Sequence, residues 1–276
     1  MSINVTLVCP IYSSLISIKS LLNEISILEI KYHSIFEIII INDSSPHINE
    51  KEIENLFNII PSLIKYRYIK LERNIGVGAI RNRGISMANS QKYISFIDDD
   101  DIPDLKNILN TAMLSSDDIV ISPIKNFRRG ISFREIYNSK IKFFYFFLRG
   151  LLKTVAWNKL YKLSFIKSEK AFFSNQRLFE DELFLLHILF SNGKKSFSFI
   201  NKPFVRVFKR KNSRSRSFNH SDISTYIFIQ FENFKFVSRK SSSVLFLWLL
   251  FFLPKSMISF VLAYLRSFYN RRIVNL

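Results

Sequence analysis

Four consecutive aspartates at residues 98–101 are the residues best suited to carry chemistry. They follow the apolar run YISFI at residues 93–97. Adjacent carboxylates repel one another, and a divalent cation would neutralise that repulsion. Asp98 and Asp100 can point the same way, so they can offer hard oxygen ligands to Mg²⁺ or Mn²⁺, with phosphate and water as the remaining ligands. The alternative is a solvated acidic loop, because aspartate also favours turns and helix caps.

A second acidic group, Glu180, Asp181 and Glu182, opens a predicted helix over residues 180–189. Acids at a helix N-terminus are ordinarily explained by the helix dipole. The alternative is that one of them is a general base, with a pKa brought near the working pH by the neighbouring acids. His187 and His220 are predicted to be structural or surface residues rather than metal ligands.

Polar or aromatic residues also follow the first two predicted strands. Asp43 comes directly after the run FEIIIIN, where its carboxylate can accept hydrogen bonds from a ribose or a base, or can cap the next helix. Pro10 and Tyr12 follow the first strand, and a tyrosine ring there can stack on a base.

The glycine-rich segment at residues 76–84 (GVGAIRNRG) does not fit a dinucleotide-binding loop. Gly76 and Gly78 match the first two glycines, but Arg81 occupies the third position, which needs a small residue. We expect the glycines to relax the backbone before a helix whose first turn carries Arg81 and Asn82. Arg81 then either reaches a diphosphate or forms a salt bridge with the acidic loop.

These candidates are positioned by an alternation of strand and helix patterns. Apolar runs predict strands, and apolar residues at helical spacing predict helices between them. The strands are predicted over 5–9, 36–41, 66–71 and 93–97, and the helices over 16–28, 48–60 and 79–88. This order predicts an α/β fold with a mainly parallel sheet flanked by helices. Ligands bind beyond the carboxyl ends of such strands, where the polar candidates lie.

Composition bounds the class of protein. The chain has 276 residues, 48% of them hydrophobic and 15% aromatic, which excludes a disordered chain. The lone Cys9 excludes an intrachain disulfide and a cysteine-rich zinc site, and it favours a reducing compartment. The first ten residues lack the pattern of a secretory signal, so we expect a cytoplasmic protein.

The positive charge is concentrated at the C-terminal end. The net charge is +18, and residues 201–276 hold 14 basic and 2 acidic residues. The basic run at 209–217 lies near two apolar stretches, 244–253 and 257–265, that Pro254 and Lys255 separate. Basic and apolar residues together favour a membrane surface over nucleic acid. Two short helices in the membrane interface, a kinked span and a buried helical pair remain open.

Six segments taken in order resemble the inverting family-2 glycosyltransferases of GT-A fold. They are CPIYSS, FEIIIINDSS, RNIGVGAIRNRGI, YISFIDDDD, WNKLYK and FEDELF, and the resemblance covers residues 3–215. It implies transfer of a sugar from a nucleotide-diphosphate donor, UDP in our expectation, with Mg²⁺ or Mn²⁺ as cofactor. It implies Asp181 as the catalytic base and Asp98 and Asp100 as the metal site. The implied donor-binding residues are Pro10, Tyr12, Asp43, Arg81, Asp98 and Asp99.

The chain departs from the family pattern at three places, which bear on the donor base and sugar. Ser13 follows the first tyrosine, residues 44–47 read SSPH, and Asp99 stands where a small residue is common. We expect one GT-A domain, with a donor-binding half over 1–105 and an acceptor-binding, catalytic half over 106–216. A helical membrane-associating extension over 217–276 follows.

The expected acceptor is a bacterial surface glycan such as lipopolysaccharide or capsule, met at the inner face of the cytoplasmic membrane. The basic segment 206–216 either closes over the diphosphate or faces lipid headgroups. The alternative function is a catalytically silent, membrane-peripheral protein of the same fold that binds a nucleotide sugar or acts as a scaffold.

Overall fold

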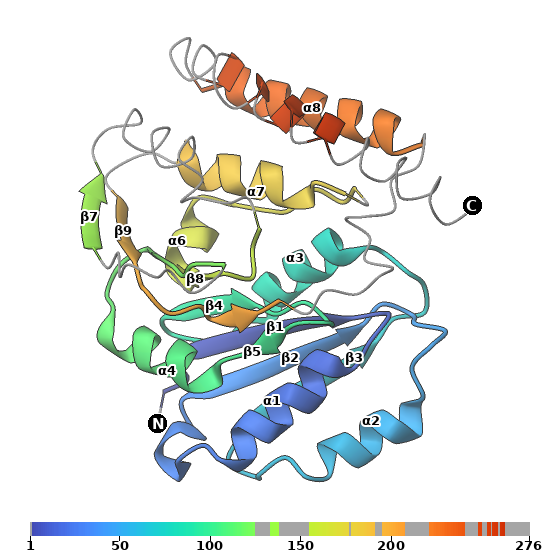
Figure 1. Cartoon of the computed structure of the whole chain (residues 1–276), viewed down its shortest axis with the longest axis vertical. Coiled ribbons are helices and arrows are strands. Elements are labelled where there is room, and N and C mark those ends of the chain that lie inside the picture. The colour runs from blue at the N-terminus through green and yellow to red at the C-terminus, as the bar shows by residue number, and fades with distance from the viewer. Residues whose placement is uncertain are drawn as a thin grey trace.

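The computed structural model describes residues 2–124, 133–137, 155–176, 178–190, 195–207, 221–240, 248–249, 253–254, 256–258 and 260–262. Three features of the sequence fall outside these ranges: the Phe-rich stretch 141–152, the basic run 209–217 and His220. Figure 1 shows a central sheet with helices on both faces, and α8 lies outermost on the side of α7.

One sheet of eight strands forms the core, in the order β3-β2-β1-β4-β8-β6-β9-β7. The strands are β1 (Val5–Ile11), β2 (Phe36–Asn42), β3 (Lys65–Lys70), β4 (Tyr93–Phe96), β6 (Ile119–Ile121), β7 (Phe133–Tyr137), β8 (Lys159–Lys162) and β9 (Lys195–Phe199). The strands from β3 to β4 run parallel, β8 pairs antiparallel with both β4 and β6, and β6 pairs parallel with β9. The predicted α/β fold with a mainly parallel sheet is confirmed.

Helices cover both faces of the sheet (Figure 1). The helices are α1 (Ile16–Ser26), α2 (Glu50–Phe57), α3 (Val77–Met87), α4 (Leu105–Leu114), α6 (Leu163–Ser168), α7 (Glu180–Leu189) and α8 (Ser221–Ser238), with a short 3₁₀ turn, η1, over Ile30–Tyr32. Residues of α1, α2 and α4 pack into one hydrophobic core, and residues of α3, α6 and α7 pack into a second one. Strands β1 and β2 are buried along their whole length. The apolar residues of β1 belong to both cores, whereas Ile39 and Ile41 of β2 pack with Ile80 of α3 in a third cluster.

Helix α3 lies close to β1 because Gly84 faces the strand. A Cβ atom at Gly84 would stand 2.4 Å from Cγ1 of Val8, so a larger residue would push the helix away. Gly76 has a φ of +86°, a conformation that favours glycine, and the helix starts at the next residue. Arg81 therefore lies in the second turn of α3, and the prediction that it lies in the first turn is wrong.

A small antiparallel pair of strands holds the segment after β9 next to the aspartate run. Strand β5 (Ile102–Pro103) directly follows Asp101 and pairs with β10 (Val205–Arg206). The N–H of Asp104 also donates to the carbonyl oxygen of Phe204, over 2.7 Å. The start of the basic segment at Arg206 thus lies beside the strand that leaves the acidic turn.

The C-terminal elements pack on α7. Tyr226 of α8 stacks on Phe260 with 4.3 Å between ring centroids, and both rings contact Phe179 at the start of α7. Within the described ranges, no helix has the length and apolar character needed to cross a membrane. Among the described residues between 244 and 265, Trp248, Ser256 and Phe260 are buried and others are exposed.

Candidate active site

The loops after β1 and β4 are joined through the carboxylate of Asp99. Its Oδ2 atom accepts hydrogen bonds from the backbone N–H groups of Tyr12, Ser13 and Ser14, over 3.2, 2.7 and 3.1 Å. The Ser13 hydroxyl donates to the same atom over 3.0 Å. Because this oxygen is turned toward the β1 loop, Asp99 holds the two loops together. Its predicted contact with the donor stays a prediction.

Asp43, at the end of β2, holds the loop that precedes α3. Its two carboxylate oxygens accept hydrogen bonds from the N–H groups of Ile75 and Gly76, over 2.7 and 3.0 Å, and the residue is buried. The Ser45 hydroxyl donates to the carbonyl oxygen of Tyr12, which ties the β1 and β2 loops together. The strand ends that carry Tyr12, Asp43 and the aspartate run thus meet at one edge of the sheet, as the sequence predicts.

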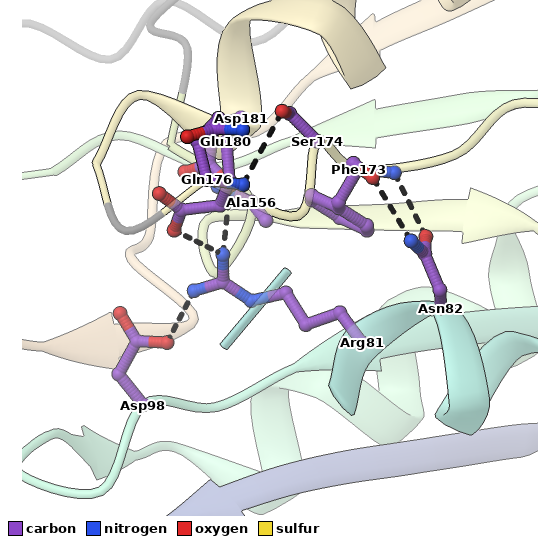
Figure 2. Close-up of polar contacts among 9 residues, drawn as sticks. All are labelled: Arg81, Asn82, Asp98, Ala156, Phe173, Ser174, Gln176, Glu180 and Asp181. Atoms are coloured by element: carbon purple, nitrogen blue, oxygen red, sulfur yellow. Dashed lines mark hydrogen bonds and ion pairs between the residues drawn. The ribbon is translucent and has the colours of Figure 1, made fainter. Parts of the chain in front are cut away.

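Arg81 brings three carboxylates from distant parts of the chain to one point (Figure 2). Its Nη2 donates to Oδ1 of Asp98 over 2.6 Å, and its Nη1 donates to Oε1 of Glu180 and Oδ1 of Asp181 over 2.9 and 2.8 Å. The Arg81 side chain is only 2% exposed, and its Nε has no hydrogen-bond partner among the described residues. Of the two predicted roles of Arg81, the salt bridge to the acidic loop is confirmed.

Burial dominates the proton affinities in this cluster. It raises the pKa of Glu180 to about 7, and the nearby charge of Asp181 adds to the effect. It also raises the pKa of Asp181, which the charge of Arg81 opposes. Burial disfavours the Arg81 charge too, but the carboxylates of Asp181, Asp98 and Glu180 hold its pKa above the ordinary value. One guanidinium thus balances three acids in a site with little water.

The residue after Arg81 fixes the segment that leads into α7. Asn82 binds the backbone of Phe173 twice: its Nδ2 donates to the carbonyl oxygen over 2.9 Å, and its Oδ1 accepts from the N–H over 2.8 Å (Figure 2). Gly78 allows the close approach, because a Cβ atom there would lie 2.0 Å from the carbonyl oxygen of Ser174. Helix α3 therefore places both the guanidinium and the start of the helix that bears Asp181.

A family model described as "Glycosyl transferase family 2" matches residues 15–179. The chain belongs to glycosyl transferase family 2. The match ends at residue 179 and so does not include Glu180 and Asp181. The ion pairs of these two acids with Arg81 are therefore an observation independent of the family match.

Relatives of this family 2 protein agree with the assignment. The putative glycosyltransferase EpsH of Bacillus subtilis (strain 168) is 31% identical over 153 residues, which span 50% of this chain and 41% of EpsH. The crystal structure of S. aureus TarS 1–349 in complex with UDP-GlcNAc has a TM-score of 0.61 at 22% identity, covering 82% of this chain and 64% of that one.

A third relative is the mannosyltransferase PcManGT from Pyrobaculum calidifontis in complex with GDP-Man and Mn²⁺. It has a TM-score of 0.59 at 12% identity, over 95% of this chain and 74% of that one. At these identities the solved structures establish a shared fold of GT-A type. This chain spans less than half of EpsH and less than two thirds of the TarS chain.

The acidic turn of this family 2 member suits a hard divalent cation. Asp98 is 30% exposed at its side chain and uses one carboxylate oxygen for Arg81, and Asp100 is partly exposed two residues further on. Among the residues that the structure describes, no three acidic, histidine or cysteine side chains form a ready metal cage. The donor set fits a cation that takes its other ligands from phosphate and water, as Mg²⁺ usually does.

Two residues near the start of α7, Ala156 and Lys159, were not predicted from the sequence as part of the site. The Ala156 N–H donates to Oδ2 of Asp181 over 3.2 Å, from the turn that leads into β8. Lys159, in β8, is 1% exposed, although lysine is seldom buried. In the sequence, Lys159 stands between Asn158 and Leu160 in the segment WNKLYK, and nothing in that pattern marks it as buried.

Glu182 has a different role from its neighbours in α7. It is buried, and its carboxylate accepts hydrogen bonds from Ser256 Oγ, Gln230 Nε2 and Asn233 Nδ2, over 2.6, 2.7 and 3.3 Å. It thereby fastens α8 and the C-terminal segment to the helix that carries Asp181. His187, on the same helix, packs between the rings of Phe172 and Phe236, and burial lowers its pKa to about 4.

Proposed function

We propose that the protein is an inverting glycosyltransferase that moves a sugar from a nucleotide-diphosphate donor to a hydroxyl group. One observation carries the proposal. Asp181 lies in the same ion-pair cluster as Asp98, at the edge of the sheet where the loops after β1, β2 and β4 meet. Asp181 is 15% exposed at its side chain, and an acid in this place beside the acidic turn can serve as a general base for an acceptor held there.

Asp181 takes the proton in the proposed reaction. The acceptor oxygen attacks the anomeric carbon and gives its proton to the Asp181 carboxylate. The bond from that carbon to the diphosphate breaks, and its electron pair leaves with the diphosphate oxygen. Because attack and departure occur on opposite faces, the configuration inverts. Burial raises the pKa of Asp181 above the ordinary value, although the charge of Arg81 opposes this, and a higher pKa makes its carboxylate a stronger base.

Asp98 and Asp100 are proposed to hold Mg²⁺ or Mn²⁺. Such a cation, when bound, stabilises the negative charge that develops on the leaving diphosphate. Since Arg81 binds one oxygen of Asp98, it orients that carboxylate within the acidic turn. That PcManGT was solved with GDP-Man and Mn²⁺ supports a cation in this chain.

The proposed donor is a UDP-sugar. TarS, at 22% identity, was solved with UDP-GlcNAc, and PcManGT, at 12% identity, was solved with GDP-Man, so the one of the two with the higher identity supports UDP. Tyr12 is proposed to stack on the base, beside Pro10 and Asp43. Its ring packs edge-to-face on His47, with 6.4 Å between centroids. We assign donor binding to residues 1–105 and the acceptor and base to residues 106–216.

Metal-dependent nucleotide release tests the enzyme. The protein would be offered UDP-GlcNAc, UDP-glucose, UDP-galactose and GDP-mannose with Mn²⁺, and the freed nucleoside diphosphate would be measured with and without chelator. We expect one UDP-sugar to be turned over, and we expect Asp100→Ala to lose the turnover that depends on Mn²⁺. Binding of a donor without turnover would favour the alternative, a silent nucleotide-sugar-binding or scaffold protein.

We also propose that residues 217–276 attach the enzyme to the inner face of the cytoplasmic membrane, where a lipopolysaccharide or capsule precursor is the acceptor. Helix α8 leaves a row of apolar side chains between 37% and 63% exposed: Ile223, Ile227, Phe228, Phe231 and Phe234. Exposed Lys235, Arg239 and Lys240 follow at its end. Each basic residue near an anionic bilayer adds ~1 kcal/mol of attraction, and the apolar row adds burial among lipid chains.

Vesicle binding tests this attachment. We expect the protein to sediment with vesicles of phosphatidylcholine and phosphatidylglycerol, less so at high salt, and the double variant F228S/F231S to stay in solution. Leu114→Ser is the matched control, because Leu114 is 89% exposed on α4, far from α8 in the chain. Equal binding by F228S/F231S, or stronger binding to DNA, would contradict the attachment.

A further inference from the structure

We infer that Lys159 is a positioning residue for Asp181. It fixes the turn at residues 155–158, and the backbone N–H of Ala156 in that turn holds the carboxylate of the base. The inference rests on the proposed function, because it takes Asp181 as the group that accepts the proton.

The contacts of the ammonium group bracket the turn. The Nζ atom of Lys159 donates to the carbonyl oxygen of Val155 and to Oδ1 of Asn158, each over 2.6 Å. Ala156 lies between these two acceptors and donates its N–H to Oδ2 of Asp181 over 3.2 Å. Loss of the ammonium would release both ends of the turn and, with them, the N–H that orients this oxygen.

The turn is also hydrogen-bonded to the sheet, so its position relative to the sheet is fixed. Asn158 donates through Nδ2 to the carbonyl oxygen of Ser122, at the end of β6, over 2.8 Å. The Ser95 hydroxyl, in β4, donates to the carbonyl oxygen of Lys159 over 3.0 Å. The lysine therefore links the strand that ends in the aspartate run to the turn that holds the base.

Charge gives Lys159 a second effect on the same carboxylate. Burial lowers the pKa of Lys159 to about 7, and the charge of Asp181 opposes that change. In return, the positive charge of Lys159 favours the ionised form of Asp181. The two oxygens of Asp181 are then held from two sides, Oδ1 by Arg81 and Oδ2 by the turn that Lys159 organises.

The test compares Lys159→Met with a matched control, Lys195→Met. Lys195 is also a buried lysine, and its Nζ donates to the carbonyl oxygens of Ile188 and Leu189, at the far end of α7. With the UDP-sugar that the donor panel selects, we expect K159M to lower kcat by about 10- to 100-fold with little change in KM, the size expected for a misplaced catalytic group. In K159M, the acidic limb of the plot of kcat against pH should move to higher pH, because the charge that favours ionised Asp181 is gone.

The control variant K195M should lose stability but keep kcat and the pH profile of the wild type. Lys159→Arg, which keeps the charge, should restore the acidic limb. A K159M protein indistinguishable from K195M in kcat and pH profile would overturn the inference. If K159M fails to fold, Asn158→Leu removes one acceptor of the ammonium instead and should show the same fall in kcat.

A double-mutant cycle with Asp181→Asn separates this inference from the proposed function. We expect K159M to change nucleotide release less than about twofold in the D181N background, because the two residues act as one unit. Full activity of D181N would refute the proposed base. Residual D181N activity that K159M lowers by the same factor as it lowers the wild type would refute the role of Lys159 alone.

Discussion

Arg81 and Asp181 are 100 residues apart in the chain, and Nη1 of the first donates to Oδ1 of the second over 2.8 Å. The same guanidinium binds Asp98 at the end of β4. The Arg81 side chain thus joins the acidic turn, the proposed cation site, to the helix that carries the proposed base.

Replacing the proposed base should abolish transfer and leave the fold intact. We expect Asp181→Asn to lower kcat by about 10²- to 10⁴-fold, the usual range for general base catalysis. The measurement is nucleoside diphosphate release in the presence of Mn²⁺. The control is Asp104→Asn, because Asp104 caps α4 through the Asn107 N–H and asparagine caps equally well. Wild-type turnover by D181N would remove Asp181 from the mechanism.

Removal of the Arg81 charge should destabilise the protein more at high pH than at low pH. Arg81→Met leaves Asp98, Glu180 and Asp181 without their shared cation, which costs about 3–5 kcal/mol when the acids are ionised. Protonation of the two buried acids relieves this loss, so the destabilisation should be smaller at pH 5 than at pH 8. Urea unfolding at both pH values measures it, and an equal loss at both would contradict the ion-pair account.

The proton affinity of Glu180 predicts a pH window for stability. Its pKa is raised to about 7 in the folded protein, so the folded state binds more protons than the unfolded state between about pH 4.5 and 7. The stability that Glu180 contributes is fully present below this window and is lost as pH rises through 7. Relative to Glu180→Gln, the wild type should lose free energy of unfolding across the window and stay level above it. A level difference across the whole range would refute the shift.

Gly78 should tolerate no side chain. A Cβ atom at this position would meet the carbonyl oxygen of Ser174 at 2.0 Å, so Gly78→Ala must displace the segment that leads into α7. We expect a loss of about 1–3 kcal/mol, together with a fall in kcat as Asp181 moves. Gly84→Ala is the control, because it crowds Val8 under α3 without touching that segment. The kcat of folded G78A should fall below that of folded G84A, and equal values would contradict the prediction.

Glu182 should hold the C-terminal elements on α7. Glu182→Gln puts an amide among three donors, from Gln230, Asn233 and Ser256, so at least one hydrogen bond is lost at a cost of about 1–3 kcal/mol. We expect faster amide hydrogen exchange in α8 than in the wild type, while exchange in β1 and β2 stays unchanged. Unaltered exchange in α8 would show that the carboxylate is not what fastens it.

The sequence determined the alternation of strands and helices through the periodicity of its apolar residues. It also determined where polar residues follow β1, β2 and β4, and parallel strands bring such positions to one edge of the sheet. The six segments that carry these positions resemble a known family, and the family match confirmed that resemblance. Lys159 and Glu182 were beyond this reasoning, because a buried charge is recognised by its partners, and those partners lie far away in the chain.

Only the tertiary structure decided which charged groups pair with one another. The sequence left two roles for Arg81, binding a diphosphate or forming a salt bridge with the acidic loop. The fold places Arg81 of α3 between the loop after β4, which carries Asp98, and the start of α7, which carries Glu180 and Asp181. The tertiary structure also decided that Asp99 binds the β1 loop and that Asp43 binds the loop before α3. The physical reason is that burial makes a charge depend on every neighbour within a few ångströms, and the fold, rather than spacing in the chain, chooses those neighbours.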